Sequence, residues 1–196
     1  MTLPLDTLNH SLTTDPFATL QVQTRQHRLH HRCGAYTFED GPALTRLVSV
    51  HRPARILELG TALGYTACCL AYGSPHTHVD TIEGDHDHVQ RARSQIARYG
   101  LQNRITVHHG DFALILADLT STYDMVFFDG FAPEFPILMR LRELLTDGGM
   151  FVCSNLQLNH GRDAQRIATV WAKPDQWRQH ESIEGGRTIV LAKAGV

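Results

Sequence analysis

The sequence lacks any hydrophobic run long enough to span a membrane, and it does not begin with a secretion signal. The opening segment, Met1–Asp6, has neither the basic cluster nor the apolar stretch of a signal peptide. Internal repeats and low-complexity tracts are also missing. We therefore expect a protein of the cytoplasm with no membrane partner.

Cysteine and net charge are both scarce. Only four cysteines occur among 196 residues, and none of them shows the C-x-x-C spacing of redox and zinc sites. Cys68, Cys69 and Cys153 fall in apolar stretches, where buried reduced thiols are common. The formal net charge of −2 gives the chain no general attraction to nucleic acids or membrane surfaces. The cysteine usage fits a reducing compartment. The low net charge disfavours a nucleic-acid partner without excluding one.

Short apolar runs alternate with amphipathic stretches from residue 54 onward, which predicts a parallel sheet covered by helices on both faces. With 42% hydrophobic residues, the chain can build one α/β domain with a substantial core. The predicted strands are Arg55–Gly60, His78–Glu83, Ile105–Gly110, Tyr123–Asp129 and Met150–Ser154. The predicted helices are Tyr65–Tyr72, His86–Tyr99, Ala113–Leu119, Phe135–Leu145 and Gly161–Trp171.

Both ends of the chain depart from this alternation. Trp177–Glu184 and Arg187–Ala194 flank a Gly-Gly pair, which predicts a terminal β-hairpin. The first fifty residues read as a helical segment, with one helix over Ala43–Val50. We therefore expect residues 1–50 to contact either the substrate or the second subunit of a homodimer, and residues 51–196 to form the main domain.

The most informative motif is Arg55-Ile-Leu-Glu-Leu-Gly-Thr-Ala-Leu-Gly-Tyr-Thr66, a strand that passes through a glycine turn into a helix. Gly60 and Gly64 permit a left-handed backbone and the close approach of a ligand. The N-terminus of the next helix offers unpaired N–H groups to a carboxylate or phosphate. The spacing disfavours a dinucleotide fingerprint and excludes a P-loop, so the motif indicates another kind of small-molecule loop.

Acidic residues stand at the ends of four successive predicted strands: Glu58, Glu83, Asp111 and Asp129. Ligands of open α/β sheets bind at this edge. Glu83 is placed to accept hydrogen bonds from ribose hydroxyls, and Asp111 from an adenine amino group, with Phe112 against the base. Asp129 would reach the centre of the cleft. For each acid taken singly, helix capping or turn formation is the alternative.

From Gly41 to about Asn155 the chain resembles the catechol O-methyltransferase-like group of class I methyltransferases, which use S-adenosylmethionine (SAM). The resemblance rests on Gly41, on Glu58 to Thr66, and on the pairs Ile82-Glu83, Gly110-Asp111 and Phe128-Asp129. It implies a seven-stranded, Rossmann-like, doubly wound and mostly parallel sheet with an antiparallel C-terminal hairpin. The cofactor-binding residues that follow are Glu58, Gly60, Thr61, Gly64, Tyr65, Thr66, Glu83, Gly110, Asp111, Phe112 and Asp129.

The same resemblance shows where this chain departs from the group. A divalent cation there is held by the aspartate after the fourth strand and by an Asp-Asn pair after the fifth. Asp129 and Asn155 match, but Ser154 stands in place of the second acid, and Ala132 stands where a lysine base belongs. We therefore expect no metal-assisted catechol chemistry. Asp129 and His160 are the candidate catalytic residues, with Glu134 as a further candidate base.

The leading hypothesis is SAM-dependent O-methylation of a small molecule. An RNA-modifying methyltransferase is the second, kept open by Arg25, Arg28 and Arg32. A non-catalytic SAM-binding protein is the third, and an NAD-dependent oxidoreductase is a distant fourth.

Histidines cluster near the N-terminus in His27-Arg-Leu-His-His-Arg-Cys33. His27, His30 and His31 could share one helix face, yet no acid or second cysteine completes a tetrahedral metal site nearby in the sequence. We interpret this stretch as a solvated, partly cationic helix that contributes to a substrate lid or a dimer contact.

Overall fold

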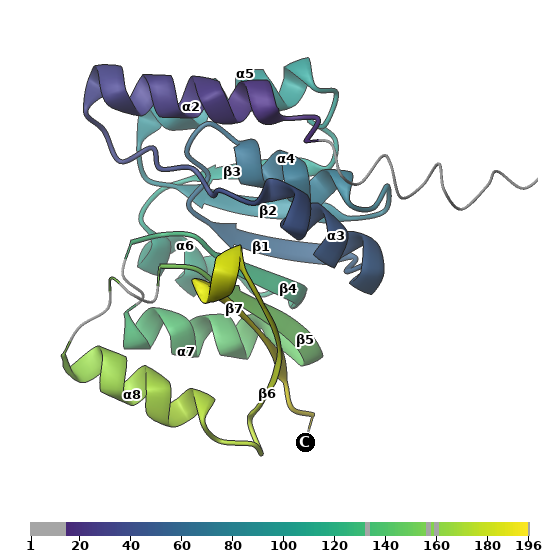
Figure 1. Ribbon diagram of the computed structural model, residues 1–196, viewed down its shortest axis with the longest axis vertical. Helices are drawn as coiled ribbons and strands as arrows, with labels where there is room; N and C mark the ends of the chain where they lie inside the picture. The colour runs from purple at the N-terminus through teal and green to yellow at the C-terminus, as the bar shows by residue number, and fades with distance from the viewer. Residues whose placement is uncertain (1–14, 132–133, 156–157, 159–160, 196) are drawn as a thin grey trace, which may run out of the picture.

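The computed structural model describes residues 15–131, 134–155, 158 and 161–195. Within these residues, seven strands form one sheet in the order β3-β2-β1-β4-β5-β7-β6 (Figure 1). The strands are β1 (Arg55–Leu59), β2 (His78–Glu83), β3 (Ile105–His109), β4 (Tyr123–Phe128), β5 (Leu145–Cys153), β6 (Trp177–Ile183) and β7 (Thr188–Lys193). The helices are α2 (Ala18–His31), α3 (Gly41–His51), α4 (Tyr65–Tyr72), α5 (His86–Arg98), α6 (Phe112–Asp118), α7 (Phe135–Leu144) and α8 (Arg162–Trp171).

The sheet is mostly parallel. Strands β1 to β5 pair in parallel, whereas β7 runs antiparallel to both β5 and β6. A short 3₁₀ turn, η2 (Glu184–Gly186), joins β6 to β7 in place of a plain two-residue turn. The predicted Rossmann-like, doubly wound fold with an antiparallel C-terminal hairpin is therefore confirmed.

Alternate residues of the central strands enter two hydrophobic clusters, one on each face of the sheet. On β1, Ile56 belongs to the first cluster and Leu57 to the second. On β4, Phe127 and Phe128 divide in the same way. Helices α2 to α5 cover the first face and α6 to α8 the second (Figure 1). This double covering explains why the strands read as continuous apolar runs.

Most observed boundaries lie within a residue or two of the predicted ones, but β5 begins much earlier than Met150. It starts at Leu145, which pairs with Tyr123 before a register irregularity that precedes Met125. The residues between, Thr146–Gly149, contain no apolar side chain. Hydrophobic periodicity therefore carried no signal for this part of the strand.

The N-terminal segment packs on the same core as the sheet. Phe17, Leu20 and Leu44 belong to the cluster that also contains α4. Tyr65 at the start of α4 donates a hydrogen bond from its hydroxyl to Asp15 Oδ2 over 2.6 Å. The boundary near residue 50 stays a prediction, while these contacts show that the described part of the segment is built into the core.

The helices are short. The longest of the described helices, α2, has 14 residues, and many of its residues are polar. In the part of the chain that the structure describes, no helix combines the length and the apolar character needed to cross a membrane.

Gly41 makes the packing of α3 against α4 possible. A Cβ atom built on Gly41 would overlap the Tyr65 hydroxyl and would lie 2.8 Å from Cys69 Sγ. We predict that Gly41→Ala lowers the free energy of unfolding by about 1–3 kcal/mol, because overpacking forces this interface apart. Urea denaturation measures the change. Arg46→Ala, at an exposed position of α3, is the control and should leave stability within about 0.5 kcal/mol. Equal stability of both variants would contradict this account of the interface.

Candidate active site

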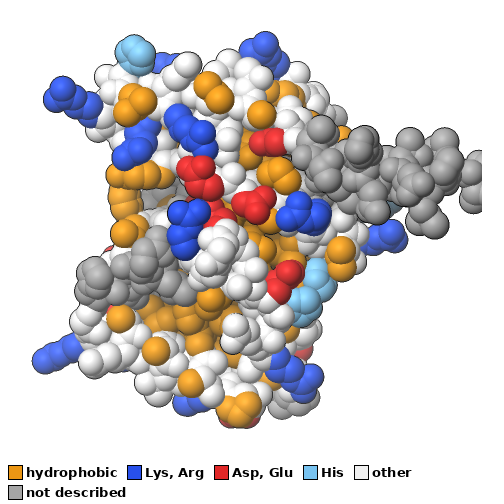
Figure 2. Space-filling view, in the orientation of Figure 1, with side chains coloured by type: hydrophobic (Ala, Val, Ile, Leu, Met, Phe, Trp, Pro, Cys, Tyr) orange, Lys and Arg blue, Asp and Glu red, His pale blue; other side chains and the backbone are white. Residues whose placement is uncertain are grey.

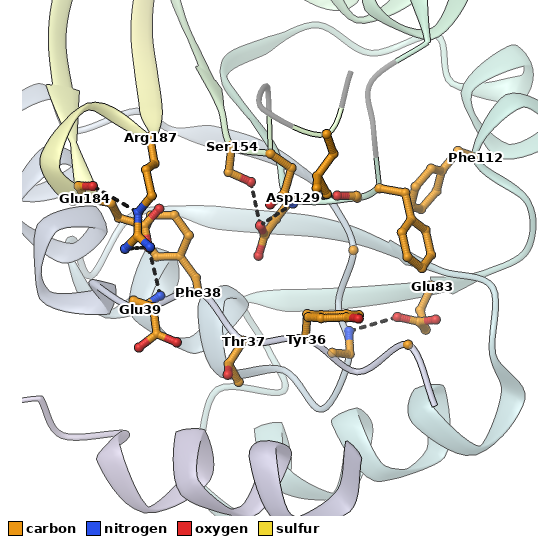
Figure 3. Close-up of a pocket in the computed structure, with 17 residues that line it drawn as sticks. Tyr36, Thr37, Phe38, Glu39, Glu83, Phe112, Asp129, Ser154, Glu184 and Arg187 are labelled. Atoms are coloured by element: carbon orange, nitrogen blue, oxygen red, sulfur yellow. Dashed lines mark hydrogen bonds and ion pairs between the residues drawn. The ribbon is translucent and has the colours of Figure 1, made fainter. Parts of the chain in front are cut away.

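A pocket of about 420 Å³ opens at the carboxyl ends of β1, β2, β4 and β5. The turn after β1 and the loops after β4 and β5 form its floor, and the segment 34–39 and the β6–β7 connection form its walls (Figure 3). The lining residues are Gly34, Tyr36, Thr37, Phe38, Glu39, Gly60, Ala62, Glu83, Phe112, Asp129, Gly130, Phe131, Ser154, Asn155, Leu158, Glu184 and Arg187.

The turn after β1 is shaped by a close main-chain approach. Gly60 has φ +102°, and a Cβ there would lie 2.8 Å from the carbonyl oxygen of Asp129. Ala62 also adopts a left-handed φ of 45°. Its N–H group donates to Glu83 Oε2 over 2.8 Å. The glycine is therefore needed for this turn, which places main-chain atoms in the pocket floor.

Glu83 joins two turns. One carboxylate oxygen accepts from Ala62 N, and the other accepts from the N–H of Asp85 over 2.9 Å. His88 Nδ1 lies 3.6 Å from the second oxygen. Glu83 thus reaches the pocket as a carboxylate fixed in orientation by main-chain donors (Figure 3).

Glu58 lies beneath the glycine turn and is fully buried. Thr81 donates to its Oε2 over 2.6 Å, and Thr81 in turn lies 2.6 Å from Thr61 Oγ1. Oε1 has no hydrogen-bond partner among the described residues. Burial raises the pKa of Glu58 to about 7, and the neighbouring hydroxyl groups of Thr66 and Thr81 oppose this shift. Glu58 therefore supports the pocket from below and holds one unsatisfied carboxyl oxygen.

Asp129 stands at the centre of the pocket (Figure 3). Its Oδ1 accepts from Ser154 Oγ over 2.6 Å and from Asn155 Nδ2 over 3.4 Å. Burial raises the pKa of Asp129 to about 8; the nearby carboxylates of Glu58 and Glu184 add to the shift, and the Ser154 and Asn155 hydrogen bonds oppose it. The site therefore holds a carboxyl group that exchanges its proton near neutral pH.

These residues do not fit a divalent cation. Asn155 turns its amide nitrogen toward Asp129 and donates a second hydrogen bond to the carbonyl of Gly130 over 2.7 Å. Ser154 also acts as a donor to the aspartate. Mg²⁺ prefers several oxygen ligands and ionised carboxylates, whereas this arrangement offers donors around one carboxyl of raised pKa.

Four other predicted cofactor residues contact other parts of the protein. Thr61 and Thr66 are buried beside Glu58. Gly64, with φ +93°, precedes α4 and packs near Ile96, and the Tyr65 hydroxyl binds Asp15. None of these four is among the lining residues. Their direct contact with a cofactor stays a prediction.

The acid after β3 caps a helix. Asp111 Oδ1 accepts from the N–H groups of Ala113 and Leu114, over 2.8 and 3.3 Å, at the start of α6. Gly110, just before it, donates to the main-chain oxygen of Glu83 over 3.0 Å. Neither residue lines the pocket, although Phe112 does. The proposed contact of Asp111 with adenine stays a prediction.

The candidate base His160 and the substituted position Ala132 lie outside the described residues. Glu134 is exposed and precedes α7.

Sequence reasoning placed the N-terminal segment near the substrate but missed the far wall of the pocket. Glu184 and Arg187 reach it from the β6–β7 connection (Figure 3). Glu184 accepts from the N–H of Glu39 over 3.0 Å and so ties this connection to the N-terminal segment. Because β6 runs parallel to the central strands, its carboxyl end lies at their edge of the sheet. In the sequence, the charged residues on either side of the Gly-Gly pair were the available indication of this wall.

More acidic than basic side chains line the pocket: Glu39, Glu83, Asp129 and Glu184, together with Arg187. Arg25 pairs with Glu39 over 2.6 Å, and Arg187 lies 4.0 Å from Glu184, so Glu83 and Asp129 are the lining acids without an arginine partner among the described residues. Figure 2 shows Asp and Glu side chains at the middle of this face, with Lys and Arg side chains beside them. Glu83 and Asp129 therefore favour a cationic ligand over an anionic one.

Comparison with known proteins gives a family match over residues 57–156, described as a methyltransferase domain. The chain is 32% identical over 97 residues to the tRNA1(Val) (adenine(37)-N6)-methyltransferase of Parabacteroides distasonis, covering 50% of this chain and 40% of that protein. It is 27% identical over 157 residues to the catechol O-methyltransferase of Niastella koreensis, covering 78% of this chain and 71% of that protein. The chain therefore spans less than half the length of the first of these relatives.

A solved structure has the same fold. The O-methyltransferase TomG from Streptomyces achromogenes, in complex with SAM, superposes with a TM-score of 0.74 at 24% identity, covering 90% of this chain and 89% of that one.

The buried carboxyl of Glu58 should make stability depend on pH. Its pKa is raised in the folded protein, so the folded state binds more protons than the unfolded state above the ordinary glutamate pKa. Stability therefore falls as pH rises from about 5 toward 7, at up to about 1.4 kcal/mol per pH unit for one such group. We predict that Glu58→Gln shows a shallower loss than wild type over this window in urea denaturation. Glu143→Gln, at an exposed position of α7, is the control and should follow wild type. Parallel curves for wild type and Glu58→Gln would contradict the assignment.

Proposed function

This chain belongs to the methyltransferase-domain family and has the fold of the class I enzymes that use SAM, and we propose that it transfers the methyl group of SAM to an oxygen atom of a small molecule. The observation that carries the proposal is a pocket at the carboxyl edge of the sheet in which Glu83 and Asp129 lie beside a glycine turn. SAM carries a positive charge on the sulfur that bears the methyl group. A pocket of about 420 Å³ lies in the size range of small-molecule sites.

Several features of the chain fit the cofactor. Gly60 lets the turn after β1 pass against the main chain of Asp129 and so forms part of the pocket lining. Glu83 presents a carboxylate after β2, suited to ribose hydroxyls, and Phe112 offers a flat apolar wall to a base. The unsatisfied Oε1 of Glu58 lies under the same turn. Among the predicted cofactor residues, Gly60, Glu83, Phe112 and Asp129 are those that line the pocket.

Asp129 is the proposed proton acceptor. When bound, SAM supplies a methyl group on a charged sulfur, and transfer to a hydroxyl forms the C–O bond as the C–S bond breaks. Asp129 lies at the pocket centre with Oδ1 held by Ser154, and its carboxyl is placed to take the hydroxyl proton. A pKa raised to about 8 suits a general base that works near neutrality. Proton transfer through Asp129 would replace the metal and lysine of the catechol-type enzymes.

The walls of the pocket favour a small, partly apolar acceptor. Tyr36, Phe38 and Phe131 contribute aromatic surface near Asp129. Arg187 supplies one cation at the far wall, beside Glu184. RNA is a less favoured substrate, although one relative is named for tRNA, because the acidic lining would repel phosphates.

Calorimetric titration tests the cofactor. We expect SAM and S-adenosylhomocysteine each to bind at one site per chain, with affinities that added Mg²⁺ does not change. Glu83→Ala should weaken both by about 1–3 kcal/mol, because it removes acceptors for the ribose and for the Ala62 N–H. Asp118→Asn, at an exposed position of α6, is the control and should bind like wild type. Absence of binding by wild-type protein would overturn the proposed function.

Asp129→Asn separates chemistry from cofactor binding. We predict that single-turnover methylation slows by about 10²-fold or more, the usual contribution of a positioned base, while affinity for S-adenosylhomocysteine changes much less. The assay uses a panel of phenols, catechols and hydroxy acids with radiolabelled SAM, and tRNA as a separate substrate. Methylation of tRNA alone would contradict the small-molecule assignment, and an unchanged rate in Asp129→Asn would contradict the role of the carboxyl.

A further inference from the structure

We propose that His27, Cys33 and His88 form a binding site for one zinc ion, which joins helix α2 to helix α5 beside the pocket. Each of these side chains offers one ligand atom, and the three atoms lie within 4.8 Å of one another. The proposed methyl transfer uses none of the three. Metal binding at this site therefore does not rest on the proposed function and can be measured without turnover.

The spacing of the ligand atoms suits tetrahedral zinc. His88 Nε2 lies 3.4 Å from Cys33 Sγ. Typical Zn–N and Zn–S bonds of about 2.0 and 2.3 Å at a tetrahedral angle place nitrogen and sulfur about 3.5 Å apart. The rings of His27 and His88 lie edge to face with centroids 5.3 Å apart. A small closure of the His27 ring would complete the three-ligand set.

Burial prepares the two imidazoles as ligands. His27 and His88 are 9% and 4% exposed, although both are polar. His30 and His31 of the same helix are exposed. The structure thus selects one histidine from the N-terminal cluster and pairs it with a residue far away in the sequence.

A carboxylate stands behind one of the ligands. His88 Nδ1 lies 3.6 Å from Glu83 Oε1, on the side of the ring away from the Nε2 that approaches Cys33. In protein zinc sites, such a carboxylate fixes the tautomer of the histidine and increases its basicity. Shortening of this distance to hydrogen-bond range would orient His88 as an Nε2 ligand.

The chemistry of the set selects the metal. Two imidazoles and a thiolate suit zinc and other borderline or soft ions, whereas Mg²⁺ and Ca²⁺ require oxygen ligands. Asp87 provides the nearest carboxylate to His27, with Oδ2 3.9 Å from His27 Nε2, and that oxygen also accepts from Arg91 over 2.7 Å. The fourth position is therefore assigned to water or to Asp87.

Zinc at this point would order one wall and part of the floor of the pocket. Cys33 directly precedes the segment 34–39, which lines the pocket. His88 contacts Glu83, which holds the Ala62 N–H in the glycine turn. Figure 1 shows α2 running alongside α5, so the ion would add a link between these two helices to the packing of α2 on the core.

Cobalt spectroscopy tests the site in the tag-free, metal-stripped protein. We expect one Co²⁺ per chain, with d–d bands and a thiolate-to-cobalt charge-transfer band, all displaced by one equivalent of Zn²⁺. Cys33→Ser should lose the charge-transfer band, and His88→Ala should lose stoichiometric binding. His30→Ala, an exposed histidine on the same helix, is the control and should bind like wild type. Circular dichroism establishes that each variant is folded.

A second measurement needs no variant. Cys33 is partly exposed, whereas Cys68, Cys69 and Cys153 are buried, so Cys33 is the thiol expected to react first with iodoacetamide. Zinc should slow alkylation of this residue, followed by mass spectrometry of its peptide, by tenfold or more, and Mg²⁺ should not. Failure to bind stoichiometric Co²⁺, a charge-transfer band that survives in folded Cys33→Ser, or alkylation at the same rate with and without zinc would overturn the proposal.

Discussion

The burial of two carboxyl groups at neighbouring strand ends is the constraint on which the site depends. Glu58 on β1 is fully buried, and Asp129 after β4 is partly buried in the lining of the pocket. Removing a carboxylate from water is costly, so each group holds its proton to a higher pH than it would in solution. A cation that enters the pocket offsets this cost. The folded protein without ligand therefore carries an electrostatic preference for a positively charged molecule.

The glycine turn makes this arrangement possible. Gly60 lets the main chain pass against the Asp129 carbonyl, and Ala62 then turns its N–H toward Glu83. Because the acids follow parallel strands, they meet at one edge of the sheet. The wall segments 34–39 and 184–187 are tied together by the hydrogen bond from Glu39 to Glu184. The pocket is thus assembled around one turn from parts of the chain that are far apart in the sequence.

Local patterns were enough to predict the sheet and the acids at its edge. The alternation of apolar runs and helices located the strands, and the run from Arg55 to Thr66 identified the binding turn. Long-range contacts could not be predicted in this way. The charged residues that flank the Gly-Gly pair mark a turn, but the sequence does not place Glu184 and Arg187 in the same pocket as Asp129. Nothing near His27 in the sequence points to His88. Both relationships arise from how the helices and the terminal hairpin pack on the sheet.

The type of residue at the end of a strand does not by itself predict what that residue contacts. Glu83 and Asp111 each follow a strand, yet Glu83 lines the pocket while Asp111 caps α6. Ser154 and Asn155 keep the place of a metal-binding pair but donate hydrogen bonds to Asp129. The chemistry proposed for this protein follows from that change, because a proton-exchanging carboxyl stands where the resemblance to the catechol O-methyltransferase-like group implies a cation.

The most direct test measures how many protons the protein releases when it binds each ligand. Calorimetric titration with SAM and with S-adenosylhomocysteine at pH 7.5, in two buffers of different ionisation enthalpy, gives the protons released on binding each ligand. The two ligands share every ionisable group and differ in the charge on sulfur. The account predicts that SAM releases more protons than S-adenosylhomocysteine, and that Asp129→Asn reduces the difference. Equal proton release by the two ligands in wild-type protein would contradict a cation-selective pocket built on buried carboxyl groups.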